Sequence, residues 1–404
     1  MTTKHPPLET VRAWFPALAR GFGFMDNAGG SQVPYVVADA VREYMLNSYA
    51  QTGAEYPASK RAGQTVAHAH DFIATVMGAG DAGKVILGSS TSALLRMLSH
   101  AYADALKPGD EVVVGTSGHE SNVSPWLLLE KRGITVRRWE PSRDTGACEL
   151  GALKDLLSSR TKLVAMVHVS NILGGVEDLK PCIAAAHAAG ARVVVDGVAY
   201  APHLAMDVAR LGADWYVFST YKVFGPHMAA LYGRTECFDE LPPPNHPWVK
   251  DFPYKFELGG ALHEGCAGLV ALEGYFNFLA GKPEGAPFDR ASVTGAFDAM
   301  AALEDPLVER FLSFLDTKPL VRLLGPKSHR VATLAFTHPR WAPQELARRM
   351  IDANLGIKAG HFHSRRLLER LGVDPDTGVV RVSFAHYNSP AEVDRLIGAL
   401  DPLL

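Results

Sequence analysis

The chain has 404 residues, of which 21% are charged and 47% are hydrophobic, and its formal net charge is −3. This balance argues against a nucleic-acid-binding protein, because such proteins carry a basic excess or a basic stripe. No apolar run approaches the roughly 18 residues of a membrane span, and the first residues form no apolar signal core. We therefore expect a cytoplasmic protein without membrane contact. The four cysteines are scattered and form no CxxC pair, so we expect neither a disulfide framework nor a metal site.

Short segments rich in branched apolar residues recur from residue 84 onward and predict β-strands. They read KVILG, EVVVG, TVRRW, KLVAMVHV, RVVVDG, WYVFS and MAALYG, and helix-length stretches such as 91–106 and 179–190 lie between most of them. Strands that alternate with helices are typical of an α/β sheet with mostly parallel strands. Because these strands are apolar throughout, we expect them to be buried on both faces, with ligands bound beyond their carboxyl ends.

The pattern changes after a Pro/Gly-rich break at 281–290. A long helical stretch follows, then two probable strands around 331–338 and 379–387, and the chain ends in a helix. For this last helix, Ser389 is the expected N-cap and Glu392 completes a capping box. We expect a smaller α+β domain here. We expect the chain to divide into an N-terminal segment that packs with the small domain, a large α/β domain and the small domain, at 1–25, 26–282 and 283–404.

Hydroxyl side chains follow the first predicted strand. Ser90, Thr91 and Ser92 open the next helix, where free backbone N–H groups and hydroxyls suit a phosphate. Plain capping of the helix explains the same residues without a ligand. His119 comes shortly after the next strand, either as a structural residue or as a flat ring that lies against another flat ring.

Two charged residues end later strands in apolar surroundings. Asp196 directly follows three valines, where a carboxylate is costly unless it has a cation or a donor as partner. It could equally cap a helix. Lys222 stands among large apolar neighbours, and a Gly-Pro turn follows after two further residues. Such a setting lowers the pKa of a lysine and makes its amine a better nucleophile toward carbonyls, whereas a surface lysine would reach into solvent.

Arg381 lies between valines near the C-terminus, where it can bind a carboxylate with two hydrogen bonds or form an internal ion pair. Together these residues describe one ligand. An aldehyde would react with Lys222, a ring nitrogen would face Asp196, and the serine-rich helix start would bind a phosphate. Pyridoxal 5'-phosphate meets these requirements. Its substrate would be an amino acid whose carboxylate contacts Arg381.

Motifs spread over residues 25–398 extend this interpretation. They are MDNAGGSQVP, GSSTSALL, GHESNVSPW, HVSNILGG, VVVDGVAYAPH, FSTYKVFGPH and GVVRVSFAHYNSPAEVDRL. With them the chain resembles the fold-type I pyridoxal-phosphate enzymes of aminotransferase class V, specifically the cysteine desulfurase-like and selenocysteine lyase-like branch. The resemblance implies a large domain with a mostly parallel seven-stranded sheet and a smaller α+β C-terminal domain. It also implies a homodimer with active sites near the subunit interface.

The resemblance assigns roles to individual residues. It implies that Lys222 forms the Schiff base with the cofactor, that Asp196 contacts the pyridinium nitrogen, and that His119 stacks on the ring. These three residues are the expected catalytic residues. The other expected cofactor-binding residues are Ser90, Thr91, Ser92, Asn171, Ser219 and Tyr221. The expected substrate-binding residues are Ala28, Gly29, Asn171, Arg381, His361 and His363.

The chain departs from this branch where desulfurases carry a nucleophilic cysteine on a mobile loop. The matching stretch is IKAGHFHSRR, with His363 at or near that place, and no cysteine follows Cys266. A persulfide forms on a thiolate, which an imidazole does not replace. Two further departures concern the cofactor. The glutamine that often contacts the ring hydroxyl is replaced near Ala199, and Gly260 stands where many relatives place a phosphate-binding threonine from the partner subunit.

We therefore predict a pyridoxal-phosphate-dependent lyase that cleaves the C–S bond of cysteine or a cysteine derivative by β-elimination. Lys222 would remove the Cα proton as a general base, and His361 or His363 could protonate the leaving group. An aminotransferase or an epimerase shares the first steps and remains an alternative. A true cysteine desulfurase or selenocysteine lyase is another, and a non-enzymatic relic that keeps the fold for dimerisation is the last.

Overall fold

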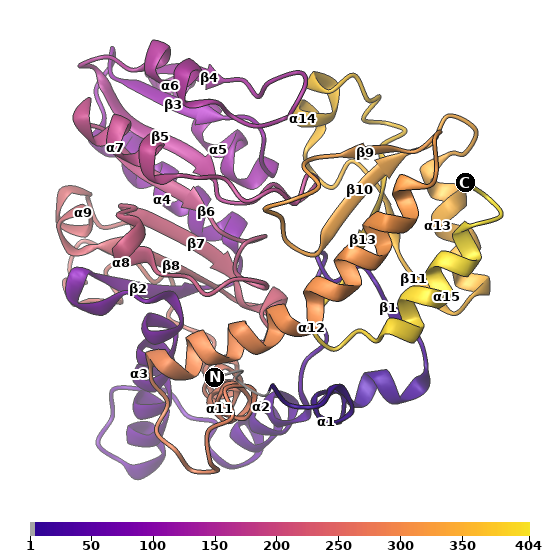
Figure 1. The fold of residues 1–404 in the computed structure, drawn as a ribbon. Helices are drawn as coiled ribbons and strands as arrows, with labels where there is room; N and C mark the ends of the chain where they lie inside the picture. The colour runs from indigo at the N-terminus through magenta and orange to yellow at the C-terminus, as the bar shows by residue number, and fades with distance from the viewer. Residues whose placement is uncertain (1–4) are drawn as a thin grey trace.

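A computed structural model describes residues 5–404, which form a large domain and a smaller C-terminal domain (Figure 1). The large domain is built on a seven-stranded sheet with the order β2-β8-β7-β6-β5-β3-β4. Strand β8 is antiparallel to both of its neighbours, and the other pairings are parallel. The strands are β2 (Gly83–Gly88), β3 (Glu111–Gly115), β4 (Thr135–Trp139), β5 (Thr161–Val167), β6 (Arg192–Asp196), β7 (Trp215–Ser219) and β8 (Ala229–Arg234). The predicted α/β fold with a mostly parallel sheet is confirmed.

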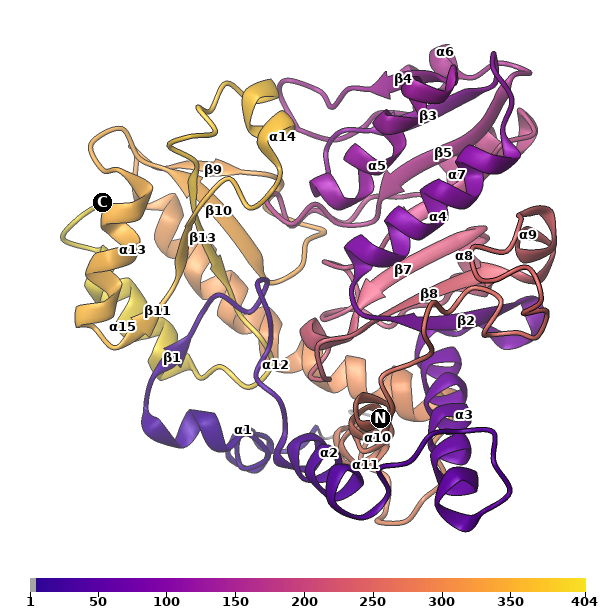
Figure 2. The same ribbon diagram turned by 180° about the vertical axis from the view of Figure 1, so that it is seen from behind.

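The sheet is buried on both faces, as its apolar strands predict. Successive side chains of a strand point to opposite faces. In β3, Val112 and Val114 therefore belong to one core cluster and Val113 to the other. Helices α4 (Thr91–Ala105) and α5 (Ser124–Leu127) cover the first face (Figure 2). The second face is covered by α3 (Pro57–Met77), α6 (Leu150–Leu156), α7 (Lys180–Ala188) and α8 (Val208–Leu211).

Helix α12 (Arg290–Asp316) runs from the large domain to the smaller one (Figure 1). It begins at a capping box formed by Asp289 and Ser292. Val293 on its first half packs into the core of the large domain, whereas Phe311 on its second half packs into the core of the smaller domain. The remaining elements of the large domain are α2 (Tyr35–Asn47), η2 (Gly80–Ala82), η3 (Glu120–Asn122), η4 (Leu128–Arg132), η5 (Thr220–Lys222), α9 (Thr235–Glu240), α10 (His263–Val270) and α11 (Leu272–Leu279).

The smaller domain contains a four-stranded antiparallel sheet with the order β12-β13-β10-β9. Its elements are β9 (Arg322–Leu324), β10 (Thr333–Thr337), α13 (Pro343–Asp352), β11 (Leu355–Gly356), β12 (Lys358–Gly360), α14 (Arg365–Arg370), β13 (Val379–Ser383) and α15 (Pro390–Leu400). The capping box predicted for Ser389 and Glu392 is present at the start of α15. Helices and an antiparallel sheet together confirm the predicted α+β architecture.

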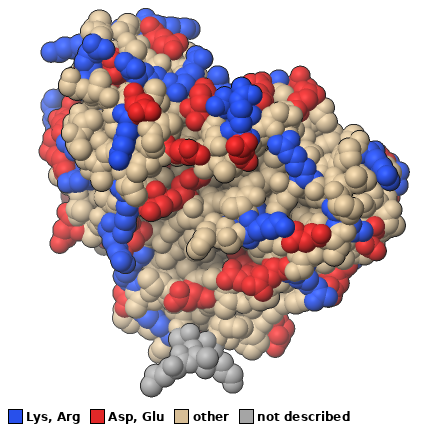
Figure 3. All heavy atoms as spheres, turned by 45° about the horizontal axis from the view of Figure 1, so that its top comes forward, with Lys and Arg blue, Asp and Glu red and all other residues tan. Residues whose placement is uncertain are grey.

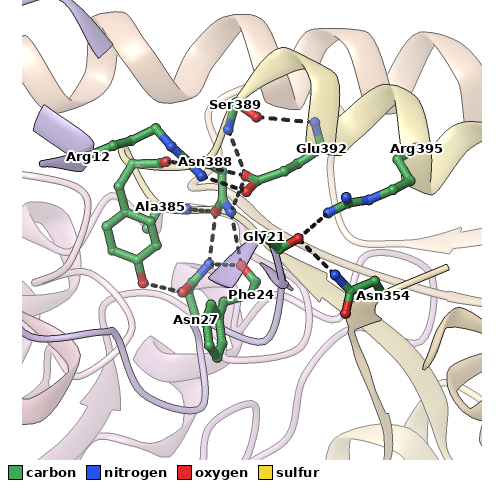
Figure 4. Close-up of polar contacts among 11 residues, drawn as sticks. Arg12, Gly21, Phe24, Asn27, Asn354, Ala385, Asn388, Ser389, Glu392 and Arg395 are labelled. Atoms are coloured by element: carbon green, nitrogen blue, oxygen red, sulfur yellow. Dashed lines mark hydrogen bonds and ion pairs between the residues drawn. The ribbon is translucent and has the colours of Figure 1, made fainter. Parts of the chain in front are cut away.

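The N-terminal segment packs against the smaller domain (Figure 4). Its elements are α1 (Leu8–Arg12), η1 (Pro16–Arg20) and β1 (Gly23–Phe24), and β1 pairs in parallel with β11. Asn27 donates hydrogen bonds to the Ser383 carbonyl at 2.9 Å and to Oδ1 of Asn388 at 3.0 Å. Arg12 forms an ion pair with Glu392 at 3.1 Å. Val11, Phe15 and Leu18 of the same segment belong to the core of the large domain, so the segment contacts both domains, and the division into 1–25, 26–282 and 283–404 stays a prediction.

The surface carries charges of both signs. Figure 3 shows acidic and basic side chains interspersed over one face. The centre of this face is hollowed, and the residues in the hollow are mostly uncharged. Between residues 5 and 404, no helix is long and apolar enough to cross a membrane. The same residues contain no cluster of three or more histidine, cysteine or acidic side chains arranged to hold a metal ion.

Candidate active site

A cavity lies at the carboxyl ends of the parallel strands, where ligands of such sheets bind. Every residue predicted to bind the cofactor lines it: Ser90, Thr91, Ser92, His119, Asn171, Asp196, Ser219, Tyr221 and Lys222. A wider cleft of about 730 Å³ adjoins this cavity and shares several of its residues. Every residue predicted to bind the substrate lines the cleft: Ala28, Gly29, Asn171, Arg381, His361 and His363. The fold thus brings the N-terminal segment, five strand ends and the smaller domain to one place.

Lys222 ends the short helix η5, which directly follows β7. Its segment is held by Ser31, whose hydroxyl donates to the Tyr221 carbonyl at 3.1 Å and accepts from the Phe224 N–H at 3.0 Å. Within the described part of the chain, the Lys222 amine has no hydrogen bond or ion pair. Burial, together with the positive charge of Arg381, lowers the pKa of Lys222 to about 8. The amine is therefore free to react and partly neutral near physiological pH.

Asp196 is the last residue of β6 and is 3% exposed. Its Oδ1 accepts a hydrogen bond from the backbone N–H of Val198 at 2.9 Å, and no cation contacts the carboxylate among residues 5–404. Burial raises the pKa of Asp196 to about 6. A buried carboxylate without a cation is costly. A protonated ring nitrogen in the cavity would supply that cation, so the partner role left open by the sequence is the one that this environment favours.

His119 presents a neutral ring to the cavity. Its Nδ1 accepts a hydrogen bond from the backbone N–H of Ser121 at 3.1 Å, which places the ring proton on Nε2. Burial lowers the pKa of His119 to about 4, and the charge of Lys222 acts in the same direction. An uncharged imidazole in this position can lie against another flat ring.

The start of α4 carries the predicted hydroxyl groups. Ser90 is the N-cap, and its hydroxyl accepts from the Ala93 N–H at 3.1 Å, so the capping interpretation is correct for this residue. The next two hydroxyls lie beside other strand ends instead. Thr91 Oγ1 lies 2.7 Å from Ser219 Oγ, and the hydroxyl of Ser92 contacts that of Ser121. A cluster of hydroxyls at the N-terminus of a long helix suits a phosphate.

Arg381 is 3% exposed and lies in β13, facing the cleft. Its Nη2 forms an ion pair with Oδ1 of Asp26 at 2.8 Å, and its Nη1 donates to the Asn171 carbonyl at 3.3 Å. The guanidinium carbon lies 3.9 Å from the ring centroid of Phe362. Both roles left open by the sequence are compatible with this arrangement, because the internal ion pair exists and the buried Nε has no hydrogen-bond partner.

The stretch that matches the desulfurase loop is a tight turn after β12. Phe362 and His363 both have left-handed backbones, with φ of 49° and 57°. Asn171 holds this turn on both sides of His363. Its amide nitrogen donates to the Phe362 carbonyl at 2.9 Å, and its amide oxygen accepts from the Ser364 hydroxyl at 2.9 Å. The Asn171 side chain is thus largely occupied by the loop, a role that the sequence did not suggest.

The same turn is tied to the large domain through Glu120. The Glu120 N–H donates to the His363 carbonyl at 2.8 Å, and the Glu120 carboxylate forms an ion pair with Arg366 at 2.7 Å. These contacts place the ring of His363 5.0 Å from the ring of His119, measured between centroids. The loop therefore presents a histidine to the reaction cleft in a defined position.

The four cysteines lie away from this site. Cys182, Cys237 and Cys266 are buried, and Cys148 is partly buried in a separate cavity beside Trp139. Burial raises the pKa of Cys148 and Cys266 to about 12 and that of Cys182 to about 11. Among the described residues that line the inner cavity and the cleft, none is a cysteine.

Two contributors to the site were not predicted. Asp26 holds Arg381, and the only sequence signal was a carboxylate within an otherwise apolar and glycine-rich stretch. His168 packs behind the cavity, stacked on Tyr200 with ring centroids 3.7 Å apart and with Nδ1 2.9 Å from the hydroxyl of Tyr216. The His168 backbone N–H also donates to the Asp196 carbonyl at 2.9 Å. These contacts fix the end of β6.

The cavity fits pyridoxal 5'-phosphate. It combines an unpartnered buried amine, a buried carboxylate without a cation, a neutral imidazole and a hydroxyl-bearing helix N-terminus, and each matches one part of that molecule. Lys222 would hold the aldehyde carbon and Asp196 the ring nitrogen. Thr91, Ser92 and Ser219 would hold the phosphate.

Comparison with known proteins gives the same assignment. The family described as Aminotransferase class-V matches residues 23–280 and 286–396. The aminotransferase-like protein FGM3 of Gibberella zeae is 36% identical over 418 residues, which cover 100% of both chains. A cysteine desulfurase of Dickeya dadantii is 32% identical over 98% of this chain and 97% of its own length. The apo structure of a cysteine desulfurase from Thermococcus onnurineus NA1 has a TM-score of 0.86 and 27% identity, and the match covers 100% of this chain and 98% of that chain.

Proposed function

This chain belongs to the class V aminotransferase family of pyridoxal 5'-phosphate-dependent enzymes, and we propose that it cleaves the C–S bond of cysteine or a cysteine derivative by β-elimination. The observation that carries the proposal is the loop at 360–364. It presents a fixed histidine at the cleft, where relatives named cysteine desulfurase are expected to act through a thiolate. The cofactor, when bound, supplies an electron sink for the pair released at Cα.

Lys222 is proposed as the residue that holds the cofactor and then moves the Cα proton. Its amine is unpartnered, and its pKa of about 8 lies near the working pH. A general base is most effective when its pKa is close to that pH. Asp196 is proposed to hold the ring nitrogen in its protonated form, since a buried carboxylate and a cation stabilise each other.

His363 is proposed as the acid that protonates the leaving sulfur. Its backbone N–H donates to Nδ1 of His361 at 3.0 Å, so the two histidines are linked. A thiolate is a better leaving group when a proton reaches it as the C–S bond breaks. Hydrolysis of the three-carbon fragment then gives pyruvate and ammonia, so that one substrate and one water yield pyruvate, ammonia and a thiol. No sulfur is bonded to the enzyme in this sequence of steps.

Arg381 is proposed to bind the substrate carboxylate, with Ala28 and Gly29 lining the adjacent wall. A Cβ at position 29 would lie 2.9 Å from Oδ2 of Asp26, so glycine lets the carboxylate of Asp26 approach the backbone. Asp26 in turn fixes one edge of the guanidinium. The free Nε of Arg381 then remains available for the substrate.

Transamination is a second candidate function. It is supported by the 36% identity with a relative named aminotransferase-like, and it uses the same proton removal by Lys222. It differs in that a keto acid leaves and a second one must be accepted. Epimerisation shares the same first step, with the proton returned to the opposite face of Cα.

A homodimer is part of the proposal. Large apolar side chains are exposed on α2, on the loop after it and on the segment before α10: Tyr35, Met45, Leu46, Tyr49, Tyr56, Trp248, Tyr254, Leu258 and Leu262. Exposed apolar patches of this kind mark interaction surfaces. Their concentration in two segments supports a second copy of the chain as the partner. The cytoplasmic location stays a prediction.

The proposed reaction is tested by incubating the pyridoxal-phosphate-loaded protein with a panel of S-substituted cysteines and measuring thiol release. Lys222→Ala is the control, since it removes the proposed base. Thiol release by the wild type and not by the variant supports the proposal. Failure of every sulfur amino acid to release thiol contradicts it, as does equal release by both proteins.

A further inference from the structure

Lys358 stands directly opposite Arg381 in the antiparallel pairing of β12 with β13. Directly opposed residues of such a pair place their side chains on the same face of the sheet, with Cβ atoms about 4.5–5.5 Å apart. Both side chains line the substrate cleft. Two cations in this arrangement repel each other, so the pairing is unfavourable unless an anion lies between them.

The protein itself supplies too little negative charge for this pair. Asp26 forms its ion pair with Arg381, and Lys358 has no ion pair within residues 5–404. Glu120 is the one carboxylate among the described residues that line the cleft, and it is bound by Arg366 at 2.7 Å. Lys358 therefore faces the cleft as an uncompensated cation.

Arg381 alone is poorly suited to a second carboxylate. Asp26 already balances its charge, so a substrate carboxylate that contacts Arg381 also meets the negative charge of Asp26. A further cation on the same face offsets this repulsion. Lys358 is placed to do so, and its charge contributes to lowering the pKa of Lys222, which puts its amine within electrostatic reach of the reaction centre.

We propose that Lys358 is a substrate-binding residue that shares the α-carboxylate with Arg381. Two cations and two carboxylates, those of Asp26 and the substrate, then form one balanced group. The proposal rests on the proposed function, in which Arg381 binds an amino acid. It predicts that the enzyme binds amino acids more tightly than the corresponding amides and amines, because these compounds lack the α-carboxylate.

The test measures equilibrium binding rather than turnover. The probe is 2-aminoisobutyrate, which has an α-carboxylate but no Cα hydrogen, and its carboxamide is the comparison ligand. Isothermal titration calorimetry gives Kd for both ligands. It is carried out on three pyridoxal-phosphate-loaded proteins, namely the wild type, Lys358→Met and Lys358→Arg. Lys131→Met is the matched control, because Lys131 is an exposed lysine that lines neither the cavity nor the cleft.

We expect Lys358→Met to weaken 2-aminoisobutyrate binding by about tenfold, the size of one charge-assisted hydrogen bond at an exposed site. Binding of the carboxamide is expected to be unchanged, and Lys358→Arg is expected to restore most of the affinity. Equal affinity of the wild type and Lys358→Met for 2-aminoisobutyrate would overturn the role of Lys358, as would equal weakening of both ligands. Absence of amino-acid binding by the wild type would instead overturn the proposed function, and with it this inference.

Discussion

The ring of His363 lies 5.0 Å from the ring of His119, although the two residues belong to different domains. Glu120 fixes this relationship by a hydrogen bond to the His363 carbonyl, and Asn171 does so by hydrogen bonds to the residues on either side of His363. A loop that carries a reactive thiol to a bound substrate would need to move, whereas this loop is held at the cleft. The arrangement suits an acid that acts in place, and several consequences can be measured.

Replacing Lys222 with alanine should reduce turnover of any substrate by about 10³-fold or more, because the change removes both the cofactor-holding amine and the base. The fold should be retained, since the side chain faces a cavity and has no hydrogen bond within the described residues. Turnover and far-UV circular dichroism check this. Substantial activity in a folded Lys222→Ala protein would contradict the assigned role.

Replacing Asp196 with asparagine should slow Cα proton removal by about 10²-fold or more, because a neutral amide does not hold a protonated ring nitrogen. Exchange of the Cα proton with deuterated solvent, followed by NMR, measures this step directly. Cofactor binding, followed by absorbance, is the control and should be kept. An unchanged exchange rate would show that Asp196 has another role.

His363→Ala should lower turnover by about 10²-fold for substrates with a basic leaving thiolate, since such a group needs a proton as it departs. The loss should be much smaller for an S-aryl cysteine, whose thiolate leaves without help. Comparison of kcat for both substrates in the wild type, His363→Ala and His361→Ala separates the two histidines. The same loss for both substrates would indicate a structural role instead.

Capture of pyridoxal phosphate by the cofactor-free protein should depend on pH through Lys222. Burial lowers the pKa of this amine to about 8, and only the neutral amine attacks an aldehyde. The capture rate should therefore rise from pH 7 and level off above about pH 9. Stopped-flow absorbance records the profile. A rate that keeps rising to pH 10.5, the ordinary pKa of lysine, would mean that the amine is not desolvated.

Asp26→Asn should lower the free energy of unfolding by about 1–3 kcal/mol, because it leaves the buried guanidinium of Arg381 without its anion. Asp316→Asn is a suitable comparison, since it breaks an exposed ion pair with Lys327 and should cost less than about 1 kcal/mol. Urea unfolding of the three proteins gives both values. Equal stabilities of the two variants would argue that the Asp26–Arg381 pair contributes little.

The sequence predicted the parts of the molecule that depend on local pattern. Apolar strands such as EVVVG can be recognised from their runs of branched apolar residues. Polar residues at the carboxyl ends of these strands must meet at one edge of a parallel sheet. Lys222, Asp196 and His119 were found in this way. The capping box of Ser389 and Glu392 was also readable, because it needs only four consecutive residues.

The contacts that the sequence did not reveal join residues far apart in the chain. Asp26 and Arg381 are separated by 355 positions, and Asn171 meets Ser364 across 193. Neither pair has a local pattern, because each depends on how the N-terminal segment and the smaller domain dock onto the sheet. The opposition of Lys358 and Arg381 likewise depends on strand register, which is set by tertiary packing.

The most direct test of the central claim identifies the three-carbon product formed from cysteine and from an S-substituted cysteine by the pyridoxal-phosphate-loaded protein. Elimination without an enzyme thiol predicts pyruvate and ammonia in equal amounts, together with sulfide from cysteine or the free thiol from its derivative. Alanine with released sulfur would contradict the claim, because it requires sulfur to be transferred before the carbon skeleton is released.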